Sequence, residues 1–212
     1  MLPAPDSLHR ALADLDFEQG EPLGLSNQGE VRRFRIAGRD LAIKQPKGRG
    51  LAWRLRAAAI RHEYRAYERL GGLKGVPGCY GLFPNDRLVL EFRPGTSLRE
   101  AAIDGNGPFF PALLDLIQAM HARGVAHGDL KRKSNLIVDA RGLPLVLDFG
   151  TATFLKPDRQ TINHRLFELI RQTDLNAWIK LKYGGYDGLS PDDEALLRRT
   201  GIERWLSRLR RG

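Results

Sequence analysis

The stretch HGDLKRKSN at residues 127–135, followed by LDFG at residues 147–150, decides the fold class of this chain. Asp129 and Asn135 stand six positions apart, and Asp148 follows thirteen positions later, at the end of the apolar run PLVL. An aspartate can accept the proton of a hydroxyl group, and Mg²⁺ prefers carboxylate and amide oxygens as ligands. The two stretches therefore predict a phosphoryl-transfer site in which Asp129 is the base and Asn135 and Asp148 bind the metal.

Lysines that would hold phosphates occur in two places. Lys131 lies two residues after Asp129 and would neutralise charge on the transferred group. Lys44 ends the predicted strand LAIK, where a buried ammonium needs an anionic partner. Glu63, nineteen residues later in a predicted helix, is the expected partner, while Glu68 lies on another face of that helix. The alternative is that these are separate, solvated surface charges.

A glycine-containing stretch, GLSNQGEV at residues 24–31, separates two predicted strands. Glycines let backbone amides approach phosphate oxygens closely, so Gly24 and Gly29 could line a phosphate cradle. Ser26 stands where the pattern G-x-G-x-x-G has its second glycine. Taken alone, this stretch is equally typical of an ordinary hairpin.

The order of the predicted elements indicates an α+β protein with two segregated lobes. Strands dominate the first part and helices the second. The expected lobes are residues 1–92, with an antiparallel sheet and one long helix, and residues 93–212, reduced and mainly helical. The expected strands lie within residues 22–44 and at residues 79–83, 87–92, 135–138 and 144–149. The expected helices lie at residues 8–16, 51–70, 97–102 and 108–124, and from about residue 163 onward with a break at residues 183–191.

Composition excludes some classes of protein and favours others. The single cysteine, Cys79, cannot form an intramolecular disulfide and is expected to be packed rather than nucleophilic. No signal peptide or membrane span is predicted, so the expected location is the cytoplasm. The formal charge of +9, from 34 basic and 25 acidic side chains, favours anionic partners. Charge alone is weak support for nucleic acid, which is not the preferred partner.

The set LAIK, a helical Glu63, HGDLK…N and DFG resembles the signature of the protein-kinase-like superfamily. The resemblance covers about residues 20–155. It implies a bilobal protein-kinase-like fold that binds ATP with Mg²⁺ or Mn²⁺ between its lobes and phosphorylates a hydroxyl acceptor. RLVLEFRPG resembles the segment between the lobes, which implies Leu90 as gatekeeper and backbone groups of residues 91–93 at adenine. The residues expected at the nucleotide are Gly24, Ser26, Gly29, Val31, Ala42, Lys44, Glu63, Leu90, Glu91 and Phe92.

Several features depart from that signature. Five residues, not four, separate Asp129 from Asn135, so either a bulge absorbs the extra residue or Ser134 shares the metal role. Gly128 replaces the arginine of HRD, no APE motif follows, and only 62 residues follow Gly150. In these respects the chain resembles small atypical kinases: the RIO group, the small kinase of the KEOPS complex, and bacterial lipopolysaccharide kinases of the Kdo/WaaP type.

The phosphate acceptor stays open at this stage. Lys131 resembles its counterpart in serine/threonine protein kinases and favours a protein hydroxyl, including autophosphorylation. The missing peptide platform favours a glycan or small-molecule kinase at the inner membrane face. A nucleotide-binding pseudokinase scaffold is the third hypothesis, suggested by Ser26 and the lengthened loop.

The basic segment KGRGLAWRLRAAAIR at residues 47–61 has two interpretations. It could lie on an anionic membrane, which would make the protein peripheral to that membrane. The preferred interpretation is a helix that packs Trp53 and Leu55 on the core, because the same helix must carry Glu63 inward. The basic segment ERWLSRLRRG at residues 203–212 is expected to dock on the C-terminal lobe through Trp205, Leu206 and Leu209.

Overall fold

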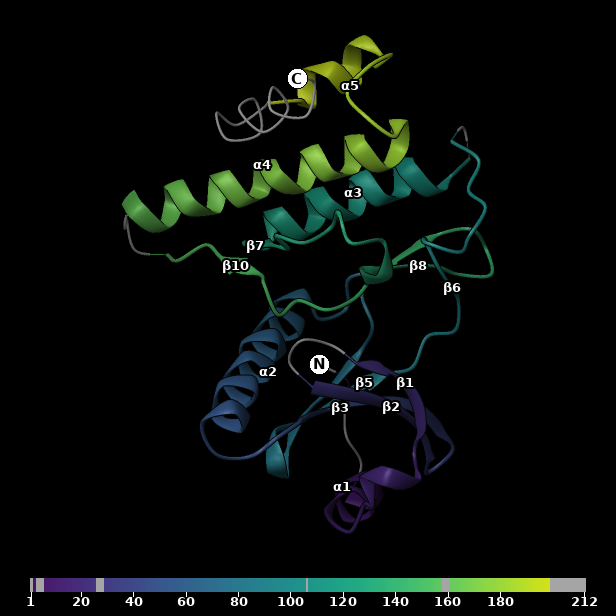
Figure 1. Cartoon of the computed structure of the whole chain (residues 1–212), viewed down its shortest axis with the longest axis vertical. Coiled ribbons are helices and arrows are strands. Elements are labelled where there is room, and N and C mark those ends of the chain that lie inside the picture. The colour runs from purple at the N-terminus through teal and green to yellow at the C-terminus, as the bar shows by residue number, and fades with distance from the viewer. Residues whose placement is uncertain (1, 3–5, 26–28, 106, 158–160, 199–212) are drawn as a thin grey trace.

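The computed structural model describes residues 2, 6–25, 29–105, 107–157 and 161–198. The chain forms two lobes, one built on a sheet with helices α1 and α2 and the other mainly helical (Figure 1). This is the α+β arrangement that the order of elements predicts, and it is consistent with a kinase-like bilobal fold. The predicted docking of residues 205, 206 and 209 lies outside the described residues.

The N-terminal lobe is built on a five-stranded antiparallel sheet with the strand order β1-β2-β3-β5-β4. Ala37 and Gly38 both have positive φ, which allows the tight reversal between the second and third strands. All five strands expected in this part of the chain are confirmed. They are β1 Glu21–Leu25, β2 Gly29–Ile36, β3 Arg39–Pro46, β4 Cys79–Phe83 and β5 Arg87–Glu91.

One face of this sheet looks toward the long helix and the second lobe. Residues directly opposite each other on antiparallel strands share a face, so Val31, Lys44 and Leu88 lie together and Ala42 with Leu90 continues the row. Helix α2 (Gly50–Leu70) packs on this face through its buried residues, which join the main core. The sheet thus presents a lysine inside an apolar surface.

The other face of the sheet has a small core of its own. Leu41, Ile43 and Val89 point to it, and helix α1 (Asp6–Ala13) closes it with Leu8 and Leu12. The short 3₁₀ helix η1 (Phe17–Gln19) follows α1 and leads into β1. Helix α1 begins and ends two to three residues before the predicted segment 8–16, which is a shift typical of helix ends.

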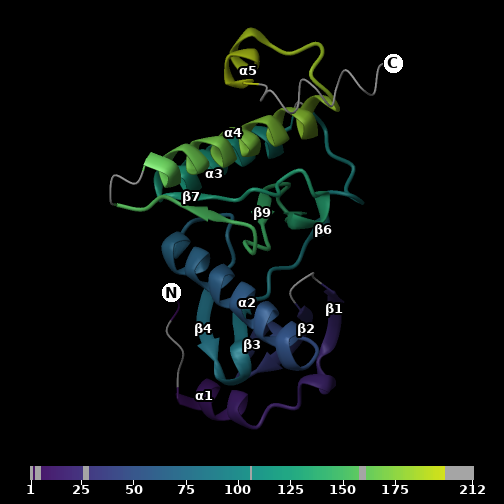
Figure 2. The ribbon, with the colours of Figure 1, turned by 60° about the vertical axis from the view of Figure 1, so that its left-hand side comes forward.

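The C-terminal lobe is built around two long helices that lie side by side (Figures 1 and 2). Helix α3 (Phe109–Ala122) and helix α4 (Thr161–Tyr183) are joined by a hydrogen bond of 2.8 Å from Trp178 Nε1 to the carbonyl of Phe110. Helix α5 (Pro191–Leu196) follows, capped by Ser190. Among the described residues no helix combines the length and apolar character needed to cross a membrane.

Short strands lie between these helices and the N-terminal lobe (Figure 2). They form a three-stranded sheet in the order β6-β8-β9 and a two-stranded pair of β10 with β7. Both strands expected at 135–138 and 144–149 are found. The elements are β6 Thr96–Ser97, β7 Val125–Ala126, β8 Leu136–Val138, β9 Pro144–Val146 and β10 Thr153–Phe154, with 3₁₀ helices η2 Pro84–Asp86 and η3 Lys133–Asn135.

The helix expected at residues 97–102 is wrong. Ser97 pairs with Ile137 between β6 and β8, and the amide of Leu98 donates to the carbonyl of Leu136 at 2.8 Å. Only one turn follows, at residues 98–100, because strand pairing holds the first residues of the segment. Tertiary pairing therefore overrides the local helix signal.

Trp178 provides a test of the core of the second lobe. Its side chain is 1% exposed, and replacing it by alanine removes its packing and its hydrogen bond to α3. We expect Trp178→Ala to lower the free energy of unfolding by about 3–5 kcal/mol. The control Ile162→Ala on the same helix, where the side chain is 85% exposed, should change it by less than about 0.5 kcal/mol. Urea denaturation followed by circular dichroism measures both; equal effects would contradict the packing described.

Candidate active site

A buried lysine joins two acidic side chains where the lobes meet. Lys44 Nζ lies 2.5 Å from Glu63 Oε2 of α2 and 3.2 Å from Asp148 Oδ1, which follows β9. The side chains of Lys44 and Glu63 are 5% and 2% exposed, whereas that of Asp148 is 25% exposed. The structure thus brings together three residues that the sequence placed 19 and 104 positions apart, and Lys44 and Glu63 are not the separate surface charges of the alternative interpretation.

Burial dominates the electrostatics of Glu63. Loss of solvent raises the pKa of the Glu63 carboxyl above its usual value, and the ammonium of Lys44 opposes that rise. Glu63 is therefore linked to Asp148 through the ammonium of Lys44, which contacts both carboxylates.

The residues around Asp148 are held in a specific conformation. Asp148 has φ +59, a left-handed conformation that is uncommon for a residue with a side chain and is concentrated at functional sites. Phe149 is fully buried between the ring of Tyr67 on α2, 5.1 Å away at a steep angle, and the ring of His127, 5.0 Å away. Because Phe149 packs between Tyr67 of α2 and His127 of the second lobe, the position of Asp148 is fixed from both lobes.

Tyr67 was not singled out from the sequence. Burial raises the pKa of its phenol well above the usual value, and its ring packs edge-on against that of Phe149 with centroids 5.1 Å apart. Its signal was weak, because an aromatic residue four positions after Glu63 on a helix is typical of any core.

The loop at residues 127–135, which carries Asp129 and Asn135, is organised by the ring of His127. The Nε2 atom lies 2.9 Å from the carbonyl of Leu147, and Nδ1 accepts a hydrogen bond of 3.2 Å from the amide of Asp129. These contacts fit a neutral ring with its proton on Nε2. His127 thereby links the loop that carries Asp129 to the strand that precedes Asp148.

Asn135 lies next to Asp129. Its Nδ2 donates to the Asp129 carbonyl at 3.2 Å, and its own carbonyl accepts from the amide of Leu147 at 2.8 Å. The first contact orients the amide so that Oδ1 is the atom left to face a cation. With a carboxylate oxygen of Asp148, this gives an all-oxygen donor set that suits Mg²⁺ or Mn²⁺ rather than a thiophilic metal.

Two successive turns absorb the extra residue of the loop. The amide of Arg132 donates to the carbonyl of Asp129 at 3.3 Å, and the amide of Asn135 donates to the carbonyl of Arg132 at 2.9 Å. Asn135 is buried, while Ser134 and Lys131 are exposed. The bulge interpretation is therefore the one the structure fits, and Lys131 is solvated beside the site.

Asp174 on α4 anchors this loop and was missed in the sequence. It is fully buried, and its carboxylate accepts the backbone amides of His127 at 2.7 Å and Gly128 at 2.8 Å. It also lies 3.0 Å from Nε2 of His121 on α3. Its signal was an acidic residue on the helix face that carries Ala177 and Trp178, both buried.

Gly128 is required where related signatures place an arginine. Its φ of +82 favours glycine, and a Cβ atom there would lie 3.0 Å from the carbonyl oxygen of Thr151. Thr151 in turn donates to the carbonyl of His127 at 3.0 Å. The absence of an arginine is thus a consequence of the close approach of the loop to the segment after Phe149.

The apolar residues expected at the nucleotide lie on one side of the sheet. Val31 pairs with Lys44, and Ala42 pairs with Leu90, so all four share the face that looks toward Asp148. Gly24 lies on β1 and Gly29 begins β2, but Ser26 lies outside the described residues. Their roles toward a nucleotide stay predictions.

Glu91 and Phe92 form the connection that leaves β5. The amide of Glu91 donates to the carbonyl of Gly78, and that of Phe92 to the carbonyl of Asp40. These two N–H groups are therefore already bonded within the lobe. The Phe92 ring lies under the guanidinium of Arg33, with its centroid 4.3 Å from that group.

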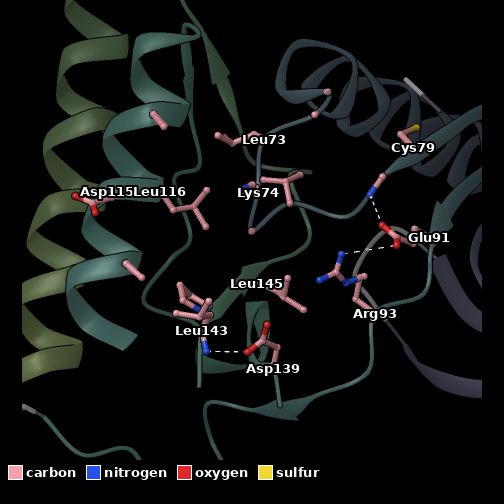
Figure 3. A pocket seen from close by; sticks show the side chains of 18 of the residues that line it. Leu73, Lys74, Cys79, Glu91, Arg93, Asp115, Leu116, Asp139, Leu143 and Leu145 are labelled. Carbon is pink, nitrogen blue, oxygen red and sulfur yellow. Dashed lines mark hydrogen bonds and ion pairs between the residues drawn. The ribbon is translucent and has the colours of Figure 1, made fainter. Parts of the chain in front are cut away.

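A cavity of about 630 Å³ lies behind this connection, on the side to which Glu91 points (Figure 3). There the Glu91 carboxylate accepts the amide of Gly78 and lies 3.7 Å from Arg93. The wall includes Cys79, Leu116 and Leu145. The Glu91 side chain thus faces away from the sheet face that carries Val31, Lys44 and Leu88. Only the backbone of Glu91 lies on the side where the nucleotide is predicted.

Cys79 in this wall is expected to be unreactive. Burial raises the pKa of its thiol to about 12, and the side chain is 3% exposed. At pH 8 the thiolate fraction should therefore be at least about a thousandfold lower than for an ordinary cysteine thiol. Labelling with a thiol reagent should be correspondingly slow in the folded protein and fast in denaturant. Rapid labelling of the native protein at pH 8 would contradict this environment.

Comparison with known proteins agrees with the geometry of the site. Serine/threonine-protein kinase D of Synechocystis is 32% identical over 81 residues, covering 35% of this chain and 16% of that protein. Serine/threonine-protein kinase cds1 of Schizosaccharomyces pombe is 30% identical over 131 residues, or 53% and 27% of the two chains. Serine/threonine-protein kinase sax-1 of Caenorhabditis elegans is 29% identical over 161 residues, or 71% and 34%. These similarities support the protein-kinase-like superfamily.

These similarities cover only a part of each relative. The chain spans between 5% and 34% of the length of the curated relatives it matches, and no family model matches it. What the relatives support is a kinase phosphotransferase.

Asp174 can be tested as a positioning residue. In Asp174→Asn the amide offers one acceptor oxygen in place of two, so a buried backbone donor loses its partner. Each such donor costs about 1–3 kcal/mol, and we expect the free energy of unfolding to fall by at least that amount. The control Asp115→Asn, on the exposed face of α3, should have little effect. Equal stability of the two variants in urea denaturation would contradict the anchoring role.

Proposed function

We propose that this chain is an ATP-dependent kinase that transfers the γ-phosphoryl group of ATP to a hydroxyl acceptor. The observation that carries the proposal is the contact of Lys44 with both Glu63 and Asp148, on a sheet face of apolar side chains. A cation held at this depth beside a partly exposed carboxylate suits a triphosphate and its metal. The kinase relatives support the same reaction class.

Each residue has a definite role in this proposal. Asp129 orients the acceptor hydroxyl, whose oxygen forms a bond to the γ-phosphorus while the bond to the β,γ-bridging oxygen breaks and ADP leaves. The hydroxyl proton passes to the Asp129 carboxylate. Lys44 holds the α- and β-phosphates and is itself held by Glu63. Asn135 and Asp148 would hold Mg²⁺ or Mn²⁺, which neutralises phosphate charge when bound.

The acceptor we propose is a serine or threonine hydroxyl of a protein, which makes the chain an atypical serine/threonine kinase. The names of the relatives and the position of Lys131 beside the base support this choice. A glycan acceptor at a membrane is the second candidate. It is suggested by the two helices described after Gly150, α4 and α5, from which no broad peptide platform is built.

The decisive experiment measures transfer of radiolabelled phosphate together with nucleotide affinity. Asp129→Asn should reduce the rate of transfer by at least about a hundredfold with little change in ATP affinity, because this carboxylate acts on the acceptor. Asp148→Ala should weaken Mg²⁺-dependent ATP binding by at least about tenfold, because it removes a metal ligand. The control Asp115→Asn should leave both quantities unchanged.

The outcomes separate the hypotheses. Full transfer by Asp129→Asn would sink the assignment of the base. Binding of ATP without transfer to protein or to any other acceptor would show a nucleotide-binding scaffold. Labelling of detergent-solubilised lipopolysaccharide in preference to protein would favour the glycan kinase.

A further inference from the structure

The first turns of α2 expose two large apolar side chains to solvent. Leu51 is 71% exposed and Leu55, one turn later, is 64% exposed. The expectation that Leu55 packs on the core is therefore wrong, although Trp53 is half-buried in a hollow beside β3. The reason is that the buried side of α2 begins at Ala57, so the turns before it extend past the core.

Positive charge surrounds these leucines. Residues 47–62 contain five arginine or lysine side chains and no acidic residue. Arg61 forms a paired contact with Asp86, at 2.7 and 2.8 Å. Arg54, next to Leu55, and Arg65, about 15 Å farther along the helix axis, are exposed, and no acidic side chain among the described residues pairs with either. The outer side of α2 is therefore both apolar and cationic.

The charge at the start of α2 works against the helix itself. The N-terminal end of a helix carries partial positive charge and is stabilised by acidic residues. Helix α2 has no acidic residue in its first turn, and its N-cap, Arg49, makes no side-chain cap hydrogen bond. Folding stability alone does not account for this composition, whereas contact with an anionic surface does.

A second exposed apolar row, on α4, shows what distinguishes the first. Ile162, Leu166 and Leu169 are 85%, 47% and 47% exposed. There Glu168 lies beside the row and pairs with Arg171 at 2.7 Å, while Arg165, between Ile162 and Leu166, is exposed. Apolar exposure and an exposed arginine occur on both helices, but α4 carries Glu168 beside its row, whereas residues 47–62 contain five arginine or lysine side chains and no acidic residue.

We propose that the outer face of α2, defined by Leu51, Arg54, Leu55, Ala58 and Arg65, binds the surface of a membrane rich in anionic phospholipid. The leucines enter the boundary between headgroups and acyl chains, and the arginines contact lipid phosphates. Aliphatic leucines favour lipid over nucleic acid, because single strands are bound through aromatic stacking. This face lies opposite Glu63 on the helix, so the proposal stands apart from phosphoryl transfer.

Vesicle co-sedimentation of the full chain tests this proposal. The partition coefficient onto vesicles of phosphatidylcholine with phosphatidylglycerol should exceed that onto phosphatidylcholine alone by at least about tenfold, and salt should reduce it. Leu51→Ser combined with Leu55→Ser should lower it by at least about tenfold, because apolar insertion is lost. Arg54→Gln combined with Arg65→Gln should remove most of the preference for the anionic lipid.

The matched control is Ile162→Ser combined with Leu166→Ser, which removes comparable exposed apolar surface from α4. It should keep the wild-type partition, and circular dichroism should show that every variant is folded. The proposal is overturned if the α2 leucine variant binds vesicles as the wild type does, or if the α4 control loses binding equally. It is also overturned if the protein binds homopolymeric RNA through the same arginines and ignores anionic vesicles. Unchanged ATP affinity in the leucine variant keeps this result separate from the proposed function.

Discussion

The ammonium of Lys44, held between the carboxylates of Glu63 and Asp148, is the interaction on which the site depends. Taking three charges out of water is costly unless each has a partner, so the sheet, α2 and the segment after β9 are bound to a common arrangement. The aromatic contacts of Phe149 with Tyr67 and His127 secure the same junction without charge. Charged contacts and aromatic packing thus both hold the junction between the lobes.

A second set of hydrogen bonds, in the other lobe, fixes the loop that carries Asp129. Asp174 holds the backbone of His127 and Gly128, and His127 orients the amide of Asp129 and the carbonyl of Leu147. The backbone of this loop is therefore held by the carboxylate of Asp174 on α4 and by the neutral ring of His127. This arrangement tolerates an extra residue before Asn135, because the added length is accommodated in two exposed turns while both ends of the loop remain fixed.

Much of this arrangement could be predicted from the sequence, for physical reasons. Lys44 and Glu63 were identifiable because a lysine on an apolar strand requires a carboxylate, and the long helices because their apolar periodicity and glycine ends are strong local signals. Asp174 and Tyr67 could not be assigned, since their partners, two backbone amides for Asp174 and the Phe149 ring for Tyr67, are brought near only by folding. The helix expected at residues 97–102 failed for the same reason: strand pairing with β8 is a distant contact that local composition does not contain. Leu55 was assigned to the core because periodicity shows that a helix has an apolar side, not where along its length the core ends.

Helix α2 is continuous from its exposed first turns to the residues buried against the sheet. It runs unbroken from Gly50 to Leu70, with Leu51 near one end and Glu63 twelve residues farther on, a distance of about 18 Å along the axis. An uninterrupted helix behaves as a stiff rod, so a displacement of its outer end is carried to Glu63 rather than absorbed by a flexible joint. The same helix therefore carries the solvent-facing leucines near one end and the carboxylate that holds Lys44 farther along, so a movement of α2 as a rigid body would shift both.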